Sequence, residues 1–163
     1  MNWAFTYANL EPYALDTPEA WLFLATNIPF FFVGNQMTTF GGNPTLGILT
    51  ELAGTASCWY HLRQVQLGGN RQRGVQLALM LDYSLAIPTL AASLAYALDL
   101  GPALPASAIA TSVAAFFCLG YGSREDVMYE KPRTFMVVHG AWHLLLQASA
   151  TIMVAAHISL TST

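Results

Sequence analysis

Long apolar runs separated by short polar stretches dominate the chain. Several of these runs approach the roughly 20 residues that a helix needs to cross the hydrocarbon core of a bilayer. A segment in lipid must satisfy its backbone hydrogen bonds internally, so we expect each run to be helical. The pattern predicts an all-α, polytopic membrane helix bundle with about five transmembrane helices, at residues 18–33, 45–62, 75–98, 104–121 and 135–157.

Start and turn signals set these boundaries. Thr17-Pro18-Glu19 has the cap, first-turn proline and early acid of a helix start, and Asn43-Pro44 repeats this signal. We expect Pro29 and Pro88 to disturb the backbone hydrogen bonds of the first and third spans. Gly, Asn and polar residues predict turns at residues 34–43, 68–70, 99–102 and 122–133.

The first 16 residues precede the first predicted span. They contain four aromatic residues and no Lys or Arg, so they lack the basic region of a secretory signal. We expect residues 1–16 to form an interfacial segment. The chain has no internal repeat and no sign of a second domain, so residues 1–163 are predicted to form a single transmembrane helical domain.

The composition supports a membrane environment. Hydrophobic residues make up 55% of the chain and charged residues 9%, with a mean hydropathy of +0.45. That balance exposes too much apolar surface for a soluble domain of this size, so membrane lipid is the expected partner. Six basic residues leave no footprint for nucleic acid, which we exclude as a partner.

The basic residues predict an orientation. All six lie in or beside the loops after the second and fourth spans, on one side of a five-span topology. The positive-inside rule makes that side cytoplasmic, or stromal or matrix in an organelle, with the N-terminus inside. The residues are Arg63, Arg71, Arg73, Arg124, Lys131 and Arg133.

Five polar residues interrupt the apolar spans. His139 and His143 are four apart on the last span and therefore share a helix face. Ser57 and His61 have the same spacing on the second span, and Asp82 lies in the third. Counting about 1.5 Å per residue from the nearest basic residue places them roughly 3–15 Å inward. All five can therefore occupy one leaflet of the membrane.

An aspartate in a membrane span needs an explanation of its own. Insertion of Asp82 costs roughly 3 kcal/mol, so we expect its carboxylate to face a partner or a water-filled cavity. His157 lies near the far end of the last span, and Glu51 lies about 15 Å along its helix from His61. We expect neither of them in the same site.

The order Ser57-x-x-x-His61, Asp82, His139-x-x-x-His143 resembles the signature of the CREST superfamily. This superfamily of membrane proteins joins alkaline ceramidases, adiponectin and progestin receptors, and myomaker-like proteins. The resemblance implies a zinc ion held by His61, His139 and His143, with Asp82 and Ser57 around its bound water. The 21-residue gap between His61 and Asp82 is most similar to the myomaker-like branch. Family members have seven spans, so the resemblance covers the first three predicted spans and the last.

The implied site predicts an activity. Three imidazoles leave one zinc position open, as in catalytic rather than structural sites. Asp82 is then the expected general base, and Ser57 is expected to donate to a developing oxyanion. The resemblance therefore implies a zinc-dependent integral-membrane hydrolase that acts on a lipid amide or ester, with ceramide-like amides as candidates.

Other interpretations remain open at this point. Histidines on apolar helices also pack or hydrogen-bond between helices, and Ser57 can bond the carbonyl one turn back. In a pigment-carrying complex, the histidines can ligate chlorophyll or haem. The chain can also be a non-catalytic accessory subunit of a larger photosynthetic or respiratory membrane complex, with the Ala- and Ser-rich fourth span as a docking face.

Overall fold

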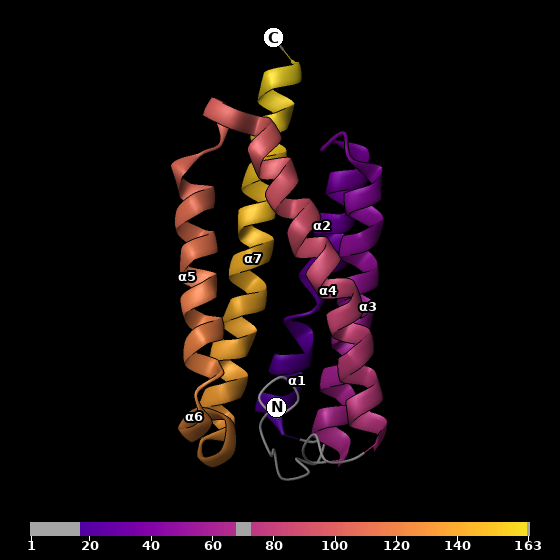
Figure 1. The fold of residues 1–163 in the computed structure, drawn as a ribbon, viewed down its shortest axis with the longest axis vertical. Coiled ribbons are helices and arrows are strands. Elements are labelled where there is room, and N and C mark those ends of the chain that lie inside the picture. Colours follow the sequence, from indigo (N-terminus) through magenta and orange to yellow (C-terminus); the bar gives the residue numbers. More distant parts are fainter. Residues whose placement is uncertain (1–16, 68–72, 163) are drawn as a thin grey trace.

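The chain folds into helices. The computed structural model describes residues 17–67 and 73–162, and this part of the chain contains no strand. The predicted all-α class is confirmed, whereas the predicted segment 1–16 and the turn at 68–70 lie outside the described residues. In chain order the elements are α1 (Pro18–Ala25), α2 (Ile28–Thr39), α3 (Pro44–Leu67), α4 (Arg73–Leu100), the 3₁₀ turn η2 (Gly101–Ala103), α5 (Ala106–Gly122), α6 (Glu125–Glu130) and α7 (Pro132–Thr161) (Figure 1).

Both predicted helix starts are confirmed. The Thr17 hydroxyl accepts a hydrogen bond from the Ala20 N–H at 3.3 Å, and Pro18 follows in the first turn of α1. The Asn43 side-chain oxygen accepts from the Leu46 N–H at 3.0 Å. Each cap satisfies an N–H that would otherwise have no partner within its helix, so these helices begin where the sequence predicts.

The first predicted span differs from the structure. The helix is interrupted at Thr26 and Asn27, and α2 then continues to Thr39. The prediction of a turn beginning at residue 34 was wrong, because Gly34 serves close packing instead of chain reversal. A Cβ there would collide with the side chain of Glu51 on α3. Tertiary packing at Gly34 thus offsets the cost of a glycine inside a helix, which is about 1 kcal/mol relative to alanine.

Of the remaining helices, α3, α4 and α7 are longer than predicted, whereas α5 is not. α3 extends five residues beyond residue 62, and α4 runs through Pro88 to residue 100, into the first two residues of the turn predicted at 99–102. The polar stretch at 122–133, expected to be a turn, contains the short helix α6. Lys131 and Arg124 donate hydrogen bonds to Asp126 at 3.2 and 3.0 Å. These two donors hold the pKa of the Asp126 carboxyl below its usual range.

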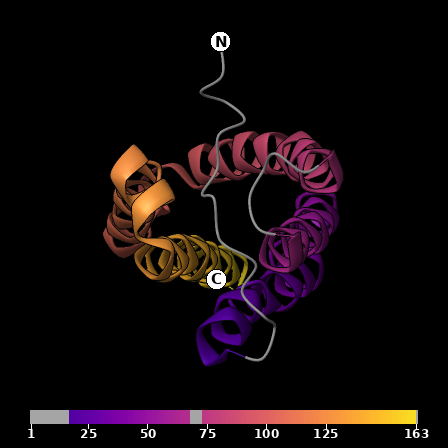
Figure 2. The same cartoon turned by 90° about the horizontal axis from the view of Figure 1, so that it is seen from below.

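The helices pack side by side in an arc. α2 packs on α3, α3 on α4, and α5 on α7, while α7 also contacts α1, α2 and α4. Figure 2 shows this arrangement along the long axis of the molecule. The C-terminal end of α3 and the N-terminal ends of α4 and α7 lie at the same lower end in Figure 1. These three helix ends, beside which Arg63, Arg73 and Arg133 lie in the sequence, are therefore grouped at one end of the molecule.

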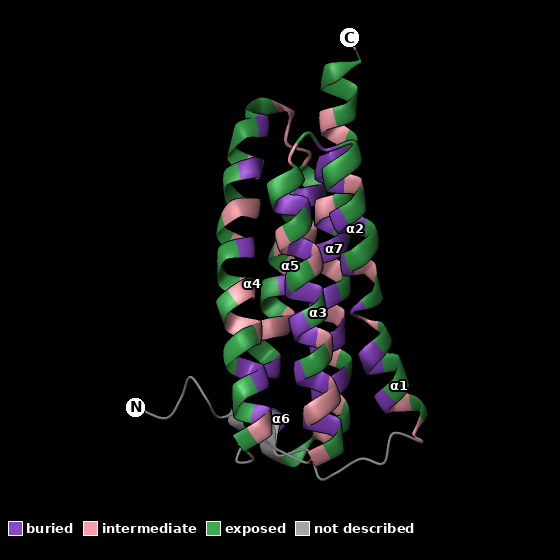
Figure 3. Ribbon diagram, turned by 90° about the vertical axis from the view of Figure 1, so that its right-hand side faces the viewer, coloured by how far each residue is buried: buried purple, intermediate pink, exposed green. Residues whose placement is uncertain are grey.

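Within residues 17–67 and 73–162, two helices are long and apolar enough to cross a membrane. They are α4 with its 3₁₀ extension, Arg73–Ala103, and α7, Pro132–Thr161; α5 is apolar but shorter. Figure 3 shows exposed residues along much of α4. Buried residues are more numerous on α3 and α7, and the candidate site lies between these two helices.

Candidate metal centre

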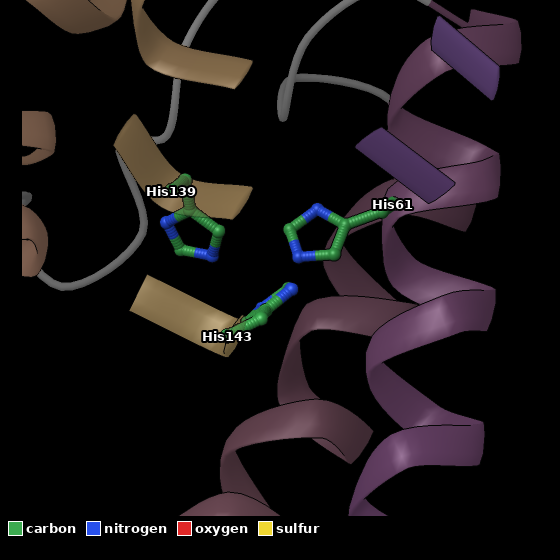
Figure 4. A group of neighbouring side chains, drawn as sticks. All are labelled: His61, His139 and His143. Carbon is green, nitrogen blue, oxygen red and sulfur yellow. The ribbon is translucent and has the colours of Figure 1, made fainter. Parts of the chain in front are cut away.

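Three histidines from two helices form a buried cluster. α3 contributes His61, and α7 contributes His139 and His143, which lie one turn apart on the face toward α3. Their side chains are 0%, 6% and 3% exposed. The three rings point toward one another (Figure 4), with centroid separations of 5.0, 5.2 and 4.9 Å. One ring nitrogen from each lies within 4.8 Å of the others, so the cluster can bind a metal ion.

Aromatic side chains surround the cluster. Phe23 of α1 lies against all three imidazoles, with ring centroids at 4.5 Å from His61, 6.1 Å from His139 and 6.4 Å from His143. Phe30 of α2 contacts His143 edge-on at 5.6 Å. This apolar shell limits access of water, which strengthens electrostatic interactions inside the site.

Two hydrogen bonds orient the rings. The Gln64 side-chain oxygen lies 3.1 Å from Nδ1 of His61, one turn along α3. The Thr26 hydroxyl lies 3.0 Å from Nδ1 of His143 and donates its proton to the Phe23 carbonyl at 2.6 Å. Among the described residues, Nε2 of His61 is buried without a hydrogen-bond partner.

Imidazole nitrogens bind zinc, copper, iron and nickel, so this donor set suits a metal ion of that group. Zinc takes neutral imidazoles at about 2.0–2.1 Å in a tetrahedral arrangement, which places ligand nitrogens roughly 3.4 Å apart. The ligand nitrogens of the cluster lie up to 4.8 Å apart. To bind one zinc ion together, two nitrogens at that separation would have to move roughly 1.4 Å closer. Rotations of the three side chains about their torsions would have to supply that contraction. A buried nitrogen without a partner, as in His61, is the orphan that a metal would satisfy.

Ser57 lies one turn before His61 on α3 and is also buried. Its hydroxyl makes no hydrogen bond to any residue within 17–67 or 73–162. The alternative in which Ser57 bonds the carbonyl one turn back is therefore not what the structure contains. Nearby Thr50 and Thr55, by contrast, each donate to the carbonyl one turn before themselves, which belongs to Leu46 and Glu51 respectively.

Asp82 is half-buried on α4. It follows Ala78 and Leu79 by one turn, and both of these residues belong to a buried apolar cluster that includes Tyr60 of α3. Its carboxylate is not one of the mutually close ligand atoms of the cluster. Within the described part of the chain it has no hydrogen bond or ion pair, so its predicted role as general base stays a prediction.

Two residues that sequence analysis excluded lie elsewhere. His157 contacts Gly42 and lies 6.0 Å from the Tyr96 ring, toward the C-terminal end of α7. Glu51 lies beside Gly34 between α2 and α3. Neither belongs to the group of close ligand atoms.

The residues that support the histidines, Gln64 and Thr26, were not among the predicted site residues. Gln64 carried a signal, because a residue three positions after His61 shares its helix face. The sequence indicates Thr26 more weakly: with Asn27 it forms a polar pair inside an apolar run, just before Pro29. Nothing local links Thr26 to a histidine 117 residues later.

Comparison of the chain with known protein families, with curated proteins and with solved structures finds no match. A functional proposal therefore depends on the side chains of the cluster and on the helices that hold them.

Proposed function

We propose that the protein is a zinc-dependent integral-membrane hydrolase that acts on an amide or ester bond of a lipid. The observation that supports this most is the buried cluster of three imidazoles from two helices. The CREST-like order of Ser57, His61, Asp82 and the two histidines of α7 agrees with the same activity. Ceramide-like amides are the substrate class that this resemblance favours.

Zinc is the metal that this donor set favours. The cluster offers three nitrogen donors without a thiolate or carboxylate among them. Three imidazoles with one open position are typical of catalytic zinc. When bound in such a site, the metal polarises a carbonyl and lowers the pKa of water. His61, His139 and His143 are the residues that would hold it.

Asp82 and Ser57 supply the proton transfers and polar contacts in this proposal. The Asp82 carboxylate accepts a proton from the attacking water and returns it to the leaving amine or alcohol. The Ser57 hydroxyl donates to the carbonyl oxygen as negative charge develops there. Two observations support these roles. The Ser57 hydroxyl is not engaged by another described residue, and the Asp82 carboxylate likewise has no described partner.

We further propose five membrane spans: α1 with α2, α3, α4, α5 and α7. In the most apolar windows of α4 and α7 only 17% and 22% of the residues are buried, whereas the core helix of a soluble protein is mostly buried. Large apolar side chains on three different helices face outward: Leu98, Phe117 and Val137 are 71%, 75% and 69% exposed. Lipid is the solvent that suits such a surface. The cluster lies near the basic end, which we assign to the cytoplasmic, stromal or matrix side.

Metal content and lipid hydrolysis together test the proposal. We expect about one zinc per chain in protein purified in detergent, and release of fatty acid from ceramide or an ester lipid. His143→Ala should lose both. His157→Ala is the matched control on the same helix, and it should retain both because His157 lies outside the cluster.

Each contrary outcome has a distinct meaning. Folded protein that carries no zinc would contradict the proposed metal site. Chlorophyll or haem bound to such protein would show that the histidines ligate a pigment instead. Fatty acid release that persists in His143→Ala contradicts the assignment of catalysis to the cluster. Zinc without hydrolysis, together with migration only in a large complex on native electrophoresis, favours a non-catalytic accessory subunit.

A further inference from the structure

The tautomer of each histidine decides whether it can bind a metal through the nitrogen that faces the cluster. A neutral imidazole carries one proton, and only the nitrogen without it can be a ligand. The hydrogen bond made by the other nitrogen selects the tautomer. For His61 and His143, the structure shows the residue that makes this bond.

Gln64 selects the tautomer of His61. Its side-chain oxygen, 3.1 Å from Nδ1, has no proton to give and can only accept. Nδ1 of His61 must therefore be protonated, which leaves the lone pair on Nε2. Both residues are fully buried, so water does not compete for either group. The opposite orientation of the Gln64 amide would direct an Nε2–H into the cluster and exclude a metal.

Thr26 selects the tautomer of His143 by a different route. Its one hydroxyl proton is donated to the Phe23 carbonyl at 2.6 Å. The same oxygen lies 3.0 Å from Nδ1 of His143. Because its only proton is already donated, it can only accept a hydrogen bond from this nitrogen. Nδ1 of His143 is therefore the protonated nitrogen, and Nε2 again carries the lone pair.

The interruption of the first span puts Thr26 in this position. Thr26 caps the C-terminal end of α1, where its N–H bonds to the Leu22 and Phe23 carbonyls. Pro29, in the first turn of α2, has no N–H to continue the helix. Irregular backbone inside a membrane span is tolerated where it serves a polar site. The break therefore has a role beyond bending the helix.

We infer that Gln64 and Thr26 are positioning residues that hold His61 and His143 in the Nδ1-protonated tautomer, so that both present Nε2 to a metal before it binds. This inference takes one element from the proposed function, which is that the metal is zinc. The tautomers themselves belong to the metal-free protein and can be measured there. Neither Gln64 nor Thr26 touches the metal or the substrate in this assignment.

Nitrogen NMR of the metal-free protein in lipid nanodiscs, labelled with ¹⁵N-histidine, is the first test. In the wild type we expect protonated Nδ1 and unprotonated Nε2 for His61 and His143. Gln64→Leu should release His61 alone, and Thr26→Val should release His143 alone. Gln64→Glu and Thr26→Ser keep an acceptor and should preserve the wild-type tautomers. An Nε2–H in either wild-type histidine, or tautomers unchanged in Gln64→Leu and Thr26→Val, would overturn the inference.

Zinc affinity, measured by competition with a chromophoric chelator, is the second test. Loss of such a supporting hydrogen bond typically weakens metal binding roughly 10–100-fold, which we expect for Gln64→Leu and Thr26→Val. The conservative variants should remain near the wild type. Thr50→Val is the matched control, because Thr50 is buried and its hydroxyl donates only within α3.

The two tests separate the inference from the proposed function. If the protein shows the expected tautomers but takes up no zinc, the missing zinc would contradict the zinc site. The tautomers would still support the positioning by Gln64 and Thr26. Zinc uptake that Gln64→Leu and Thr26→Val leave unchanged would overturn the positioning and support the zinc site.

Discussion

Phe23 is the side chain through which the first helix reaches the histidine cluster. It is 2% exposed and lies against all three imidazoles. Removing its ring opens a path for water and chelator without removing a ligand. We therefore expect Phe23→Ala to release zinc to a chelator roughly 10-fold faster than the wild type.

Stopped-flow absorbance with a chromophoric chelator measures this release. Phe32→Ala is the control, because Phe32 is 67% exposed on α2. Equal release rates in wild type and Phe23→Ala would show that this ring does not control access to the cluster.

Asp82 separates metal binding from catalysis. Its carboxylate is not among the close ligand atoms, so Asp82→Asn should retain zinc. The same change removes the proposed general base, and loss of general base catalysis typically lowers a rate roughly 10²–10⁴-fold. Zinc content and the turnover number for lipid hydrolysis are the two measurements. Loss of zinc in Asp82→Asn would instead make the carboxylate a ligand.

The contact between α2 and α3 depends on glycine. A Cβ at Gly47 would collide with the Thr38 hydroxyl and lie 2.6 Å from the Gly34 carbonyl oxygen. Such small residues let helix backbones approach closely, which supplies packing in lipid. Gly47→Val should cost about 1–3 kcal/mol of stability, because overpacking forces the helices apart. Thermal unfolding in detergent measures the loss.

The chain offers a matched glycine for this experiment. A Cβ at Gly120 of α5 would meet nothing within 4 Å, so Gly120→Ala should be tolerated. If Gly47→Val unfolds at the same temperature as Gly120→Ala, the close approach of α2 and α3 is not what stabilises this pair.

Serine joins α5 to α7. The Ser149 and Ser112 hydroxyls lie 2.8 Å apart, and Ser149 donates to the Ala108 carbonyl at 2.8 Å. Interhelical hydrogen bonds in membranes contribute about 0.6 kcal/mol on average, so Ser149→Ala should lower the stability by a similar amount. Ser159→Ala is the control for unfolding measurements, since that exposed hydroxyl bonds only within α7. Equal losses in both variants would count against an interhelical role for Ser149.

At the scale of the whole molecule, the two ends differ in charge. The basic ends of the helices lie together, and the C-terminal end of α7 lies at the opposite end (Figure 1). In the proposed topology, Ser123 faces the cytoplasmic side and Ser162 the other side. A membrane-impermeant thiol reagent should therefore label Ser123→Cys and Ser162→Cys from opposite faces of sealed vesicles. Both native cysteines, Cys58 and Cys118, are replaced by alanine in this experiment.

Labelling of both positions from one face would contradict the proposal that α7 crosses the membrane between them. Labelling from opposite faces with Ser123→Cys accessible only from outside would keep α7 as a span and reverse the orientation.

The sequence by itself determined the features that depend on local chemistry. Apolar runs and the caps at Thr17 and Asn43 were sufficient to predict helices and two of their starts, because helix hydrogen bonds form between near neighbours. The four-residue spacing of His139 and His143 likewise determined that they share a face. The same local rules misjudged Gly34, whose small size serves a contact with α3 that no neighbouring residue reveals.

Only the tertiary structure decided which faces meet. His61 joins the histidines of α7, and Thr26 reaches His143 across 117 residues, because the helices pack at one particular rotation and depth. Rotation and depth result from side-chain packing between helices, which a single sequence does not encode in any local pattern. The ligands could therefore be proposed from residue type and spacing, whereas their supporting residues, Gln64 and Thr26, required the fold.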